Sequence, residues 1–300
     1  MGAVYLAFDK KLGHLVALNV LLSVDAAGIY RFKKEFRALA DVTHPNLVAL
    51  HELYSEGDRW FFTMQYVEGK DLLIYVHGGR RRLFDSTPKP IPELPEDDEA
   101  FDTMEPQVRG LEMLFPSPLQ NEDRLRDVLV QVTHGLRAVH ASGKLHRDLK
   151  PENVLVTPEG RVVLLDFGIV TESRVDIHET IATVIGTPAY MSPEQCRGRD
   201  VGEAADWYAL GVMLYEALTG EVPFDGPPLQ VISRKQEIDA VPPNQLVSGV
   251  PDDLNTLCMQ LLSRDQAARP DGEAVERALK ARRAASIPVG VGERAGDRKP

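Results

Sequence analysis

The stretch His146-Arg147-Asp148-Leu149-Lys150-Pro151-Glu152-Asn153 decides how this chain is interpreted, together with Asp166-Phe167-Gly168, which begins thirteen residues after Asn153. Two β-branched and apolar runs, Val154-Leu155-Val156 and Val162 to Leu165, lie between the two motifs. A turn at Pro158-Glu159-Gly160 joins these runs into a predicted hairpin. A tripeptide such as Asp-Phe-Gly occurs often by chance, but the two motifs in this order and at this spacing form a specific pattern.

This pair of motifs resembles the protein kinase superfamily, and most of all its bacterial Ser/Thr branch. In that family the catalytic loop reads H-R-D-x-x-x-x-N and the metal loop reads D-F-G. The resemblance implies an α+β fold of two lobes, with a small β-rich N-terminal lobe that here lacks its first strand and a larger helical C-terminal lobe. It also implies an ATP- and Mg²⁺-dependent protein Ser/Thr kinase, which transfers the γ-phosphate to Ser/Thr hydroxyls of protein substrates and autophosphorylates its activation loop.

The chemistry of phosphoryl transfer explains these residue types, because the protein supplies mainly positioning and charge neutralisation. By resemblance, Asp148 would accept the proton of the substrate hydroxyl, and Lys150 would reach the transferred phosphate as a point charge. Asn153 and Asp166 would supply hard oxygen ligands for Mg²⁺ between the nucleotide phosphates. The alternative for a loop aspartate such as Asp148 is a turn or a helix cap, which the surrounding motif disfavours.

A second block, residues 186–194, resembles the family's substrate-docking segment, with Ser-Pro-Glu in place of the commoner Ala-Pro-Glu. The resemblance implies that Thr187 bonds the catalytic loop and accompanies Ser/Thr specificity, and that Glu194 pairs with Arg269. Asp206 would accept backbone N–H bonds of the catalytic loop and would cap its own helix. A Gly/Pro turn is the alternative for this block. A small-molecule phosphotransferase is disfavoured, because kinases of that kind generally lack such a segment.

Residues next to these motifs imply regulation and lobe packing. Arg147 marks the type of kinase that activation-loop phosphorylation switches on, since a phosphate can pair with its guanidinium. Thr180 and Thr183 are the favoured acceptors, and the alternative is that they are only polar loop residues. His146 and Phe167 fit the family's apolar spine between the lobes, where a histidine is structural rather than a ligand or a base.

The beginning of the chain would form the roof of the nucleotide site. By resemblance, the nucleotide-binding residues are Gly2, Val4, Ala17, Asn19, Glu35, Met64, Gln65, Tyr66, Val67 and Leu155. Val4, Ala17 and Leu155 would sandwich the adenine. Met64 would be the gatekeeper, and the backbone of residues 65–67 would be the hinge that bonds the adenine edge.

Two departures from the family pattern predict reduced activity. Gly2 matches the third glycine of G-x-G-x-x-G-x-V, so the chain begins inside this phosphate loop, and we expect a truncated fragment or a misassigned start. Asn19 stands where the family has a lysine that binds the α- and β-phosphates and pairs with a glutamate, here Glu35. Lys33 or Lys34 could substitute only from a different helix face. A pseudokinase, meaning a signalling and binding module, is therefore the alternative, and a single-base sequence variant is another explanation of Asn19.

The composition fits a soluble globular protein, with 43% hydrophobic and 26% charged residues in a chain of 300. The net charge of −11 disfavours nucleic acid and anionic lipid as partners. Cys196 and Cys258 are far apart and have no metal-ligand spacing, so we expect a reducing, cytoplasmic environment. No apolar run has the length of a membrane span, and no secretion signal is apparent.

The chain divides into three predicted parts. Residues 1–68 are the N-lobe and hinge, residues 69–280 are the C-lobe, and residues 281–300 are a basic linker tail that hints at another domain beyond it. A disordered surface insertion is predicted at about 78–121, because residues 88–106 hold five prolines, seven acidic residues and one lysine. Apolar spacing predicts strands within 4–22, 47–53 and 60–67, and helices at 30–39, 125–139, 207–218 and 254–262.

Overall fold

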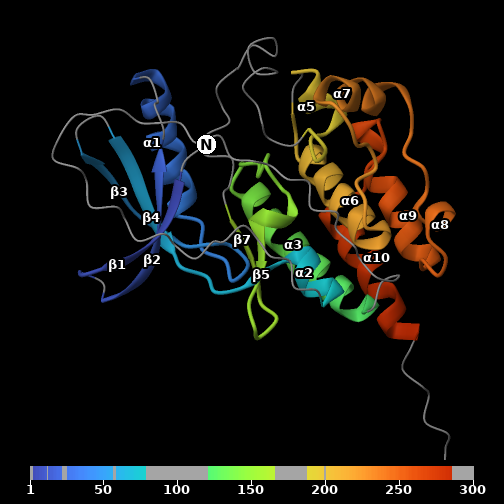
Figure 1. Ribbon diagram of the computed structural model, residues 1–300, viewed down its shortest axis with the longest axis horizontal. Coiled ribbons are helices and arrows are strands. Elements are labelled where there is room, and N and C mark those ends of the chain that lie inside the picture. The colour runs from blue at the N-terminus through green and yellow to red at the C-terminus, as the bar shows by residue number, and fades with distance from the viewer. Residues whose placement is uncertain are drawn as a thin grey trace, which may run out of the picture.

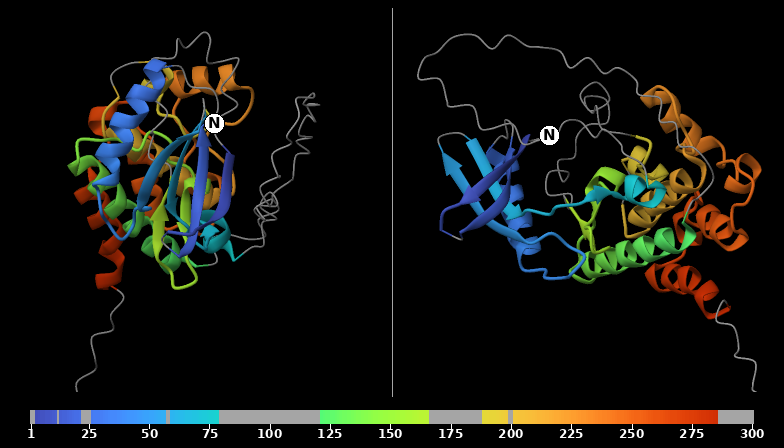
Figure 2. Two further views of the ribbon diagram at one scale, coloured as in Figure 1. Left: turned by 90° about the vertical axis from the view of Figure 1, so that its left-hand side faces the viewer. Right: turned by 60° about the horizontal axis from the view of Figure 1, so that its bottom comes forward.

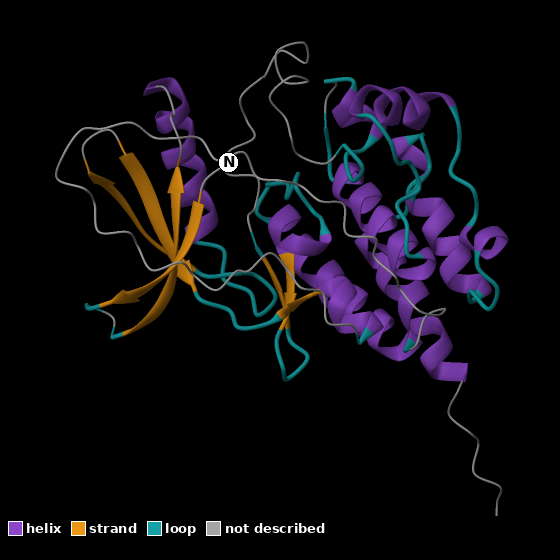
Figure 3. Cartoon of the chain, viewed as in Figure 1, coloured by secondary structure: helices purple, strands orange, loops and turns teal. Residues whose placement is uncertain are grey.

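The computed structural model of the chain describes residues 3–11, 13–21, 26–56, 59–78, 121–165, 188–198 and 201–285. They form a sheet-rich N-terminal region beside a helical C-terminal region (Figure 1, Figure 2). Figure 3 shows most strands in the first region and most helices in the second, so the predicted two-lobed α+β fold is confirmed. Outside the described residues lie most of the predicted insertion and the predicted site residues Gly2, Asp166, Phe167, Thr180, Thr183 and Thr187.

Four antiparallel strands form the N-terminal sheet in the order β1-β2-β4-β3. Their bounds are Ala3–Asp9 for β1, His14–Leu21 for β2, Leu50–Glu56 for β3 and Arg59–Gln65 for β4. The turn between β1 and β2 closes as the sequence predicts, because Gly13 adopts a φ of 73° and its N–H donates to the Asp9 carbonyl at 2.8 Å.

Helix α1 (Ala26–Ala40) covers one face of this sheet. The rings of Phe32 and Phe36 lie 5.8 and 5.6 Å from the ring of Phe62 on β4. Residues directly opposite each other on neighbouring strands share a face. The pairing of Asn19 with Phe62 therefore puts Asn19 on the face that α1 covers.

The C-terminal region is built around α6, which is buried on all sides from Ala205 to Leu218. The bounds of its helices are α2 Leu72–His77, α3 Glu122–Ala141, α5 Pro193–Cys196, α6 Ala204–Thr219, α7 Pro228–Glu237, α8 Pro243–Leu246, α9 Asp252–Leu261 and α10 Gly272–Ala285, with the short 3-10 helices η1 Pro151–Asn153 and η2 Gln266–Ala268. Helix α10 continues beyond residue 280, where the tail is predicted to begin. None of the described helices has both the length and the apolar character to cross a bilayer.

A second, three-stranded sheet lies where the two regions meet, in the order β5-β6-β7. Its strands are β5 Lys70–Asp71, β6 Val154–Val156 and β7 Val162–Leu164, so the hairpin predicted between the two kinase-like motifs is confirmed. The strand predicted at 47–53 is confirmed for residues 50–53, which belong to β3, but residues 47–49 are not part of β3. Leu164 N donates to Asn46 O at 2.9 Å and Val48 N donates to Leu164 O at 3.0 Å, because the buried Leu47 and Val48 pair with β7 of the other lobe.

Gly211 allows α6 and α9 to pack closely. A Cβ atom at this position would lie 2.7 Å from Leu261 Cβ and 3.2 Å from the Leu261 carbonyl carbon, neither of which can swing aside. Replacing glycine by alanine in a helix stabilises the folded state by about 1 kcal/mol. Overpacking a core destabilises it by about 1–3 kcal/mol.

The difference between these two effects is about 0–2 kcal/mol, so we expect Gly211→Ala to lower the free energy of unfolding by about 1 kcal/mol, measured by urea denaturation. Gly202→Ala is the matched control, since no atom lies within 4 Å of the Cβ that it adds. A Gly211→Ala protein as stable as the Gly202→Ala protein would contradict this account of the helix packing.

Candidate active site

The catalytic loop between α3 and β6 brings three predicted catalytic residues together. Lys150 Nζ lies 2.8 Å from Asp148 Oδ2, and Asn153 Nδ2 donates to Asp148 O at 2.8 Å and to Asp148 Oδ2 at 3.0 Å. The 3-10 turn η1 makes the contacts between Asn153 and Asp148 possible, because it turns the chain so that Asn153 lies back against Asp148. The side chain of Asp148 is 46% exposed while that of Lys150 is 16% exposed, so the carboxylate is held firmly and remains accessible.

The donor set of this loop fits a hard cation. Between described residues, the Asn153 carboxamide makes two hydrogen bonds and both use Nδ2, so its Oδ1 is the atom that can act as a ligand. Leu165 N donates to Asn153 O at 2.8 Å, so the residue before Asp166 is bonded directly to the loop. Within the described ranges no three His, Cys, Asp or Glu side chains gather around a common metal position, and Asp166 lies outside those ranges.

The backbone of the loop has an unusual conformation at Arg147. Its φ is 63°, and no other non-glycine residue in the described part of the chain has a positive φ. Arg147 N donates to Asp206 Oδ1 at 2.8 Å, and Gln195 Nε2 donates to Arg147 O at 3.1 Å. Hydrogen bonds from α6 and α5 thus hold the peptide groups on both sides of Arg147. A strained backbone conformation persists only when the surrounding structure holds it in this way.

Asp206 accepts the backbone N–H of the loop that the sequence predicts, and it has a further partner. His146 N donates to Asp206 Oδ2 at 2.8 Å, and His140 Nε2 lies 2.7 Å from the same oxygen. The predicted capping role of Asp206 is wrong, because α6 begins at Ala204 and Glu203 is its N-cap. Burial alone would raise the pKa of Asp206, but the His140 hydrogen bond and the neighbouring histidines outweigh it and hold the pKa below its ordinary value of 3.8.

Two buried histidines surround this carboxylate. His146 is completely buried, and burial lowers its pKa, so a structural, neutral imidazole is the natural state at pH 7. His140 was not among the residues predicted from the sequence. The sequence feature that could have identified it is a polar side chain at a core-facing position of α3, near Leu136 and Val139, which are also buried.

The predicted pair of Glu194 and Arg269 is present. Arg269 Nη1 and Nη2 donate to the two carboxylate oxygens of Glu194 at 2.6 and 2.8 Å, and both side chains are buried. Burial would raise the pKa of Glu194, but the hydrogen bonds from Arg269 hold it below its ordinary value. Ser192 caps α5 with a capping box to Gln195, so residues 192–195 have a fixed shape.

The predicted nucleotide residues of the N-terminal region lie along one face. Val4 pairs with Asn19, and Ala17 pairs with Met64, so these four side chains share the face toward α1. Val4 is exposed while Met64 is buried. Asn19 Oδ1 is buried and has no hydrogen-bond partner among the described residues.

The remaining nucleotide residues are distributed around the junction of the lobes. Gln65 N donates to Ala49 O at 2.8 Å, Tyr66 is exposed and Val67 is half-buried. Leu155 lies on β6 opposite Val163 and is half-buried. Glu35 lies on α1.

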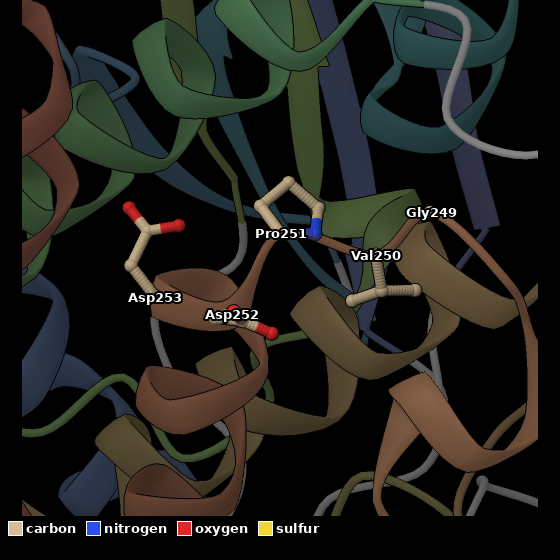
Figure 4. Close-up of a pocket in the computed structure, with 5 residues that line it drawn as sticks. All are labelled: Gly249, Val250, Pro251, Asp252 and Asp253. Carbon is tan, nitrogen blue, oxygen red and sulfur yellow. The ribbon is translucent and has the colours of Figure 1, made fainter.

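The two lysines that could replace the missing cation lie elsewhere. Lys33 Nζ is 3.9 Å from the centre of the Trp60 ring, and Lys34 is exposed. A hollow lined by Gly249 to Asp253 at the start of α9 contains none of the predicted site residues (Figure 4). Asp253 in this hollow is bound by Arg126, so the feature belongs to the packing of α3 on α9.

A profile of the family described as the protein kinase domain matches residues 1–281. The chain therefore belongs to the protein kinase domain family.

Similar bacterial proteins are named Ser/Thr kinases. Serine/threonine-protein kinase pkn2 of Myxococcus xanthus is 33% identical over 282 residues, which cover 90% of this chain and 29% of that protein. PknB of Mycobacterium leprae is 31% identical over 288 residues, which cover 93% of this chain and 40% of that protein. The chain thus spans less than half the length of these relatives. A mutant PknI kinase domain of Mycobacterium tuberculosis has the same fold, with a TM-score of 0.64 and 22% identity over 96% of this chain and 91% of that one.

Asp206→Asn tests the buried carboxylate. Because the pKa of Asp206 is depressed in the folded state, its contribution to stability is present above pH 3.8 and is lost as the pH falls through the folded-state value. The variant should be less stable by roughly 3 kcal/mol near neutral pH, since it leaves buried donors without an acceptor. Its stability should also fall less steeply with acid, which urea denaturation at a series of pH values will measure.

Asp239→Asn serves as the control, because Asp239 is an exposed carboxylate that pairs with Arg264 at the surface. An Asp206→Asn protein with the same acid dependence as the parent would show that the carboxylate is not what stabilises the loop.

Proposed function

We propose that this chain is a Ser/Thr protein kinase domain, which transfers the γ-phosphate of ATP to Ser and Thr hydroxyls of proteins. The observation that carries the proposal is the accessible carboxylate of Asp148, held by Lys150 and Asn153. Relatives that are named Ser/Thr protein kinases support it.

In the proposed reaction the residues of the loop act on the substrate hydroxyl and the transferred group. Asp148 orients the hydroxyl and accepts its proton as the oxygen attacks the γ-phosphorus, while the bond from that phosphorus to the bridging oxygen breaks and ADP leaves. Lys150, 2.8 Å from that carboxylate, offsets the negative charge on the transferred group. Asn153 Oδ1 and Asp166 are the residues that would hold Mg²⁺, and the bound ion would supply positive charge to the phosphate oxygens.

The proposal includes control by autophosphorylation. Thr180 and Thr183 are the proposed acceptors, and Arg147 is the proposed partner of the phosphate, since a guanidinium binds a phosphate through paired hydrogen bonds. Thr187 is proposed to bond the catalytic loop and to favour Ser/Thr substrates. His146 and Phe167 are the proposed spine residues.

A second candidate function is a pseudokinase, a binding and signalling module without efficient transfer. Asn19 favours it, because its buried Oδ1 has no hydrogen-bond partner within the described part of the chain and a carboxamide oxygen cannot attract phosphate as a lysine ammonium does. Asn19 can present its Nδ2 to a phosphate instead, but this bond carries no full charge.

We further propose a cytoplasmic location and protein substrates rather than nucleic acid. The acidic insertion at about 78–121 is proposed as a partner-binding arm.

Asn19→Lys distinguishes the two functions. Restoring a charge-assisted bond to the phosphates should raise Mg·ATP-dependent phosphorylation of a protein substrate on the order of tenfold to more than a hundredfold. Radiolabel transfer from ATP measures it, with protein phosphorylated on Ser or Thr as the product.

Asp148→Ala in the parent and in the Asn19→Lys protein is the control, because both should lose the transfer. A chain that binds ATP but transfers no phosphate, even with lysine restored and the upstream strand supplied, would support the binding module and overturn the kinase.

A further inference from the structure

Lys235 on α7 is a buried lysine for which the proposed mechanism has no use. The residue is completely buried, with 0% of its surface exposed. Its Nζ donates to the backbone carbonyls of Pro188, Ala189 and Met191, at 2.7 Å for Pro188 and for Met191. All three acceptors belong to the described part of the segment that resembles a substrate-docking segment.

These three hydrogen bonds match what an ammonium group can donate. It has three N–H bonds and no acceptor, so the segment satisfies every donor. Burial lowers the pKa of Lys235 to about 7, which means that keeping the charge in this place is costly. Among the ion pairs between described residues none includes Lys235, and the Tyr208 ring lies 5.3 Å from Nζ. The carbonyls are therefore the main compensation for the buried charge.

The docking segment is fixed at its other end by different elements. Gln195 bonds the backbone of Arg147 in the catalytic loop, and Glu194 pairs with Arg269. Neither contact reaches residues 188–191. Lys235 does so through three backbone carbonyls, and the Tyr190 hydroxyl of the same segment donates to Glu216 Oε2 on α6. A further bond, from Arg197 Nε to Gln236 Oε1 at 3.0 Å, ties α7 to the end of α5.

We propose that Lys235 is a positioning residue for the protein substrate. It fixes the backbone of residues 188–191, so that α7 sets the shape of the docking surface without contacting the nucleotide or the reacting atoms. This role rests on the proposed kinase function, and it predicts that Lys235 affects the use of the protein substrate and leaves ATP binding unchanged.

The test compares Lys235→Met, Lys235→Arg and the surface control Lys280→Met, whose parent side chain is exposed and pairs with Glu276. The first measurement is hydrogen exchange of the full chain, which needs no activity. Amides of residues 189–192 should exchange about tenfold faster in Lys235→Met, with α9 unchanged. The second is steady-state phosphorylation of a peptide in the Asn19→Lys background. The KM for peptide should rise about tenfold in Lys235→Met, while the KM for ATP stays within about twofold.

In Lys235→Arg the KM for peptide should lie between those of Lys235→Met and the parent, because a guanidinium retains the positive charge and the hydrogen-bond donors. Lys280→Met should have the same KM for peptide as the parent. Unchanged exchange at residues 189–192 would overturn the proposal whatever the activity. Equal effects on both KM values, or faster exchange throughout the C-terminal region, would also overturn it by showing a general structural role. A parent that never transfers phosphate would refute the kinase function alone, since the exchange measurement would still decide the anchoring role of Lys235.

Discussion

The catalytic loop depends on one buried carboxylate. Asp206 is fixed in the central helix α6, and its two oxygens receive the N–H groups of His146 and Arg147. A left-handed conformation at a non-glycine residue costs about 1–3 kcal/mol, so Arg147 keeps it only because its neighbours leave no alternative. The position of Asp148 follows from this arrangement, since its own N–H donates to the carbonyl of His146.

Parts of this arrangement are accessible from the sequence because their causes are local. The hairpin from Val154 to Leu164 is predicted by two short β-branched runs and a Gly turn, and α6 is predicted by a long apolar run. The motif around Asp148 is specific by its composition and spacing. The contacts of Asp206 and of Glu194 could be expected from family resemblance only, because nothing in their immediate neighbours identifies the partner.

Other parts depend on contacts between distant segments. Lys235 looks in the sequence like a solvent-facing lysine on an amphipathic helix, and its burial is decided by carbonyls that lie 44 to 47 positions earlier in the chain. His140 looks like one polar residue on α3 until Asp206 is brought against it. Leu47 has the composition of a strand residue, but its partner is Leu164 of the other lobe. The spacing of apolar residues cannot predict such partners, because it describes only residues within one helix or strand.

The pairing of residues 46–48 with β7 has a mechanical consequence. Among the described residues, the chain crosses between the lobes at residues 66–69 after β4, and residues 46–48 form a second connection through their backbone hydrogen bonds to β7. Two attachments that lie side by side allow one region to rotate about the line through them but resist its translation past the other region. The N-terminal sheet therefore has a hydrogen-bonded attachment to the C-terminal region besides the covalent one, and this attachment opposes sliding of one region past the other.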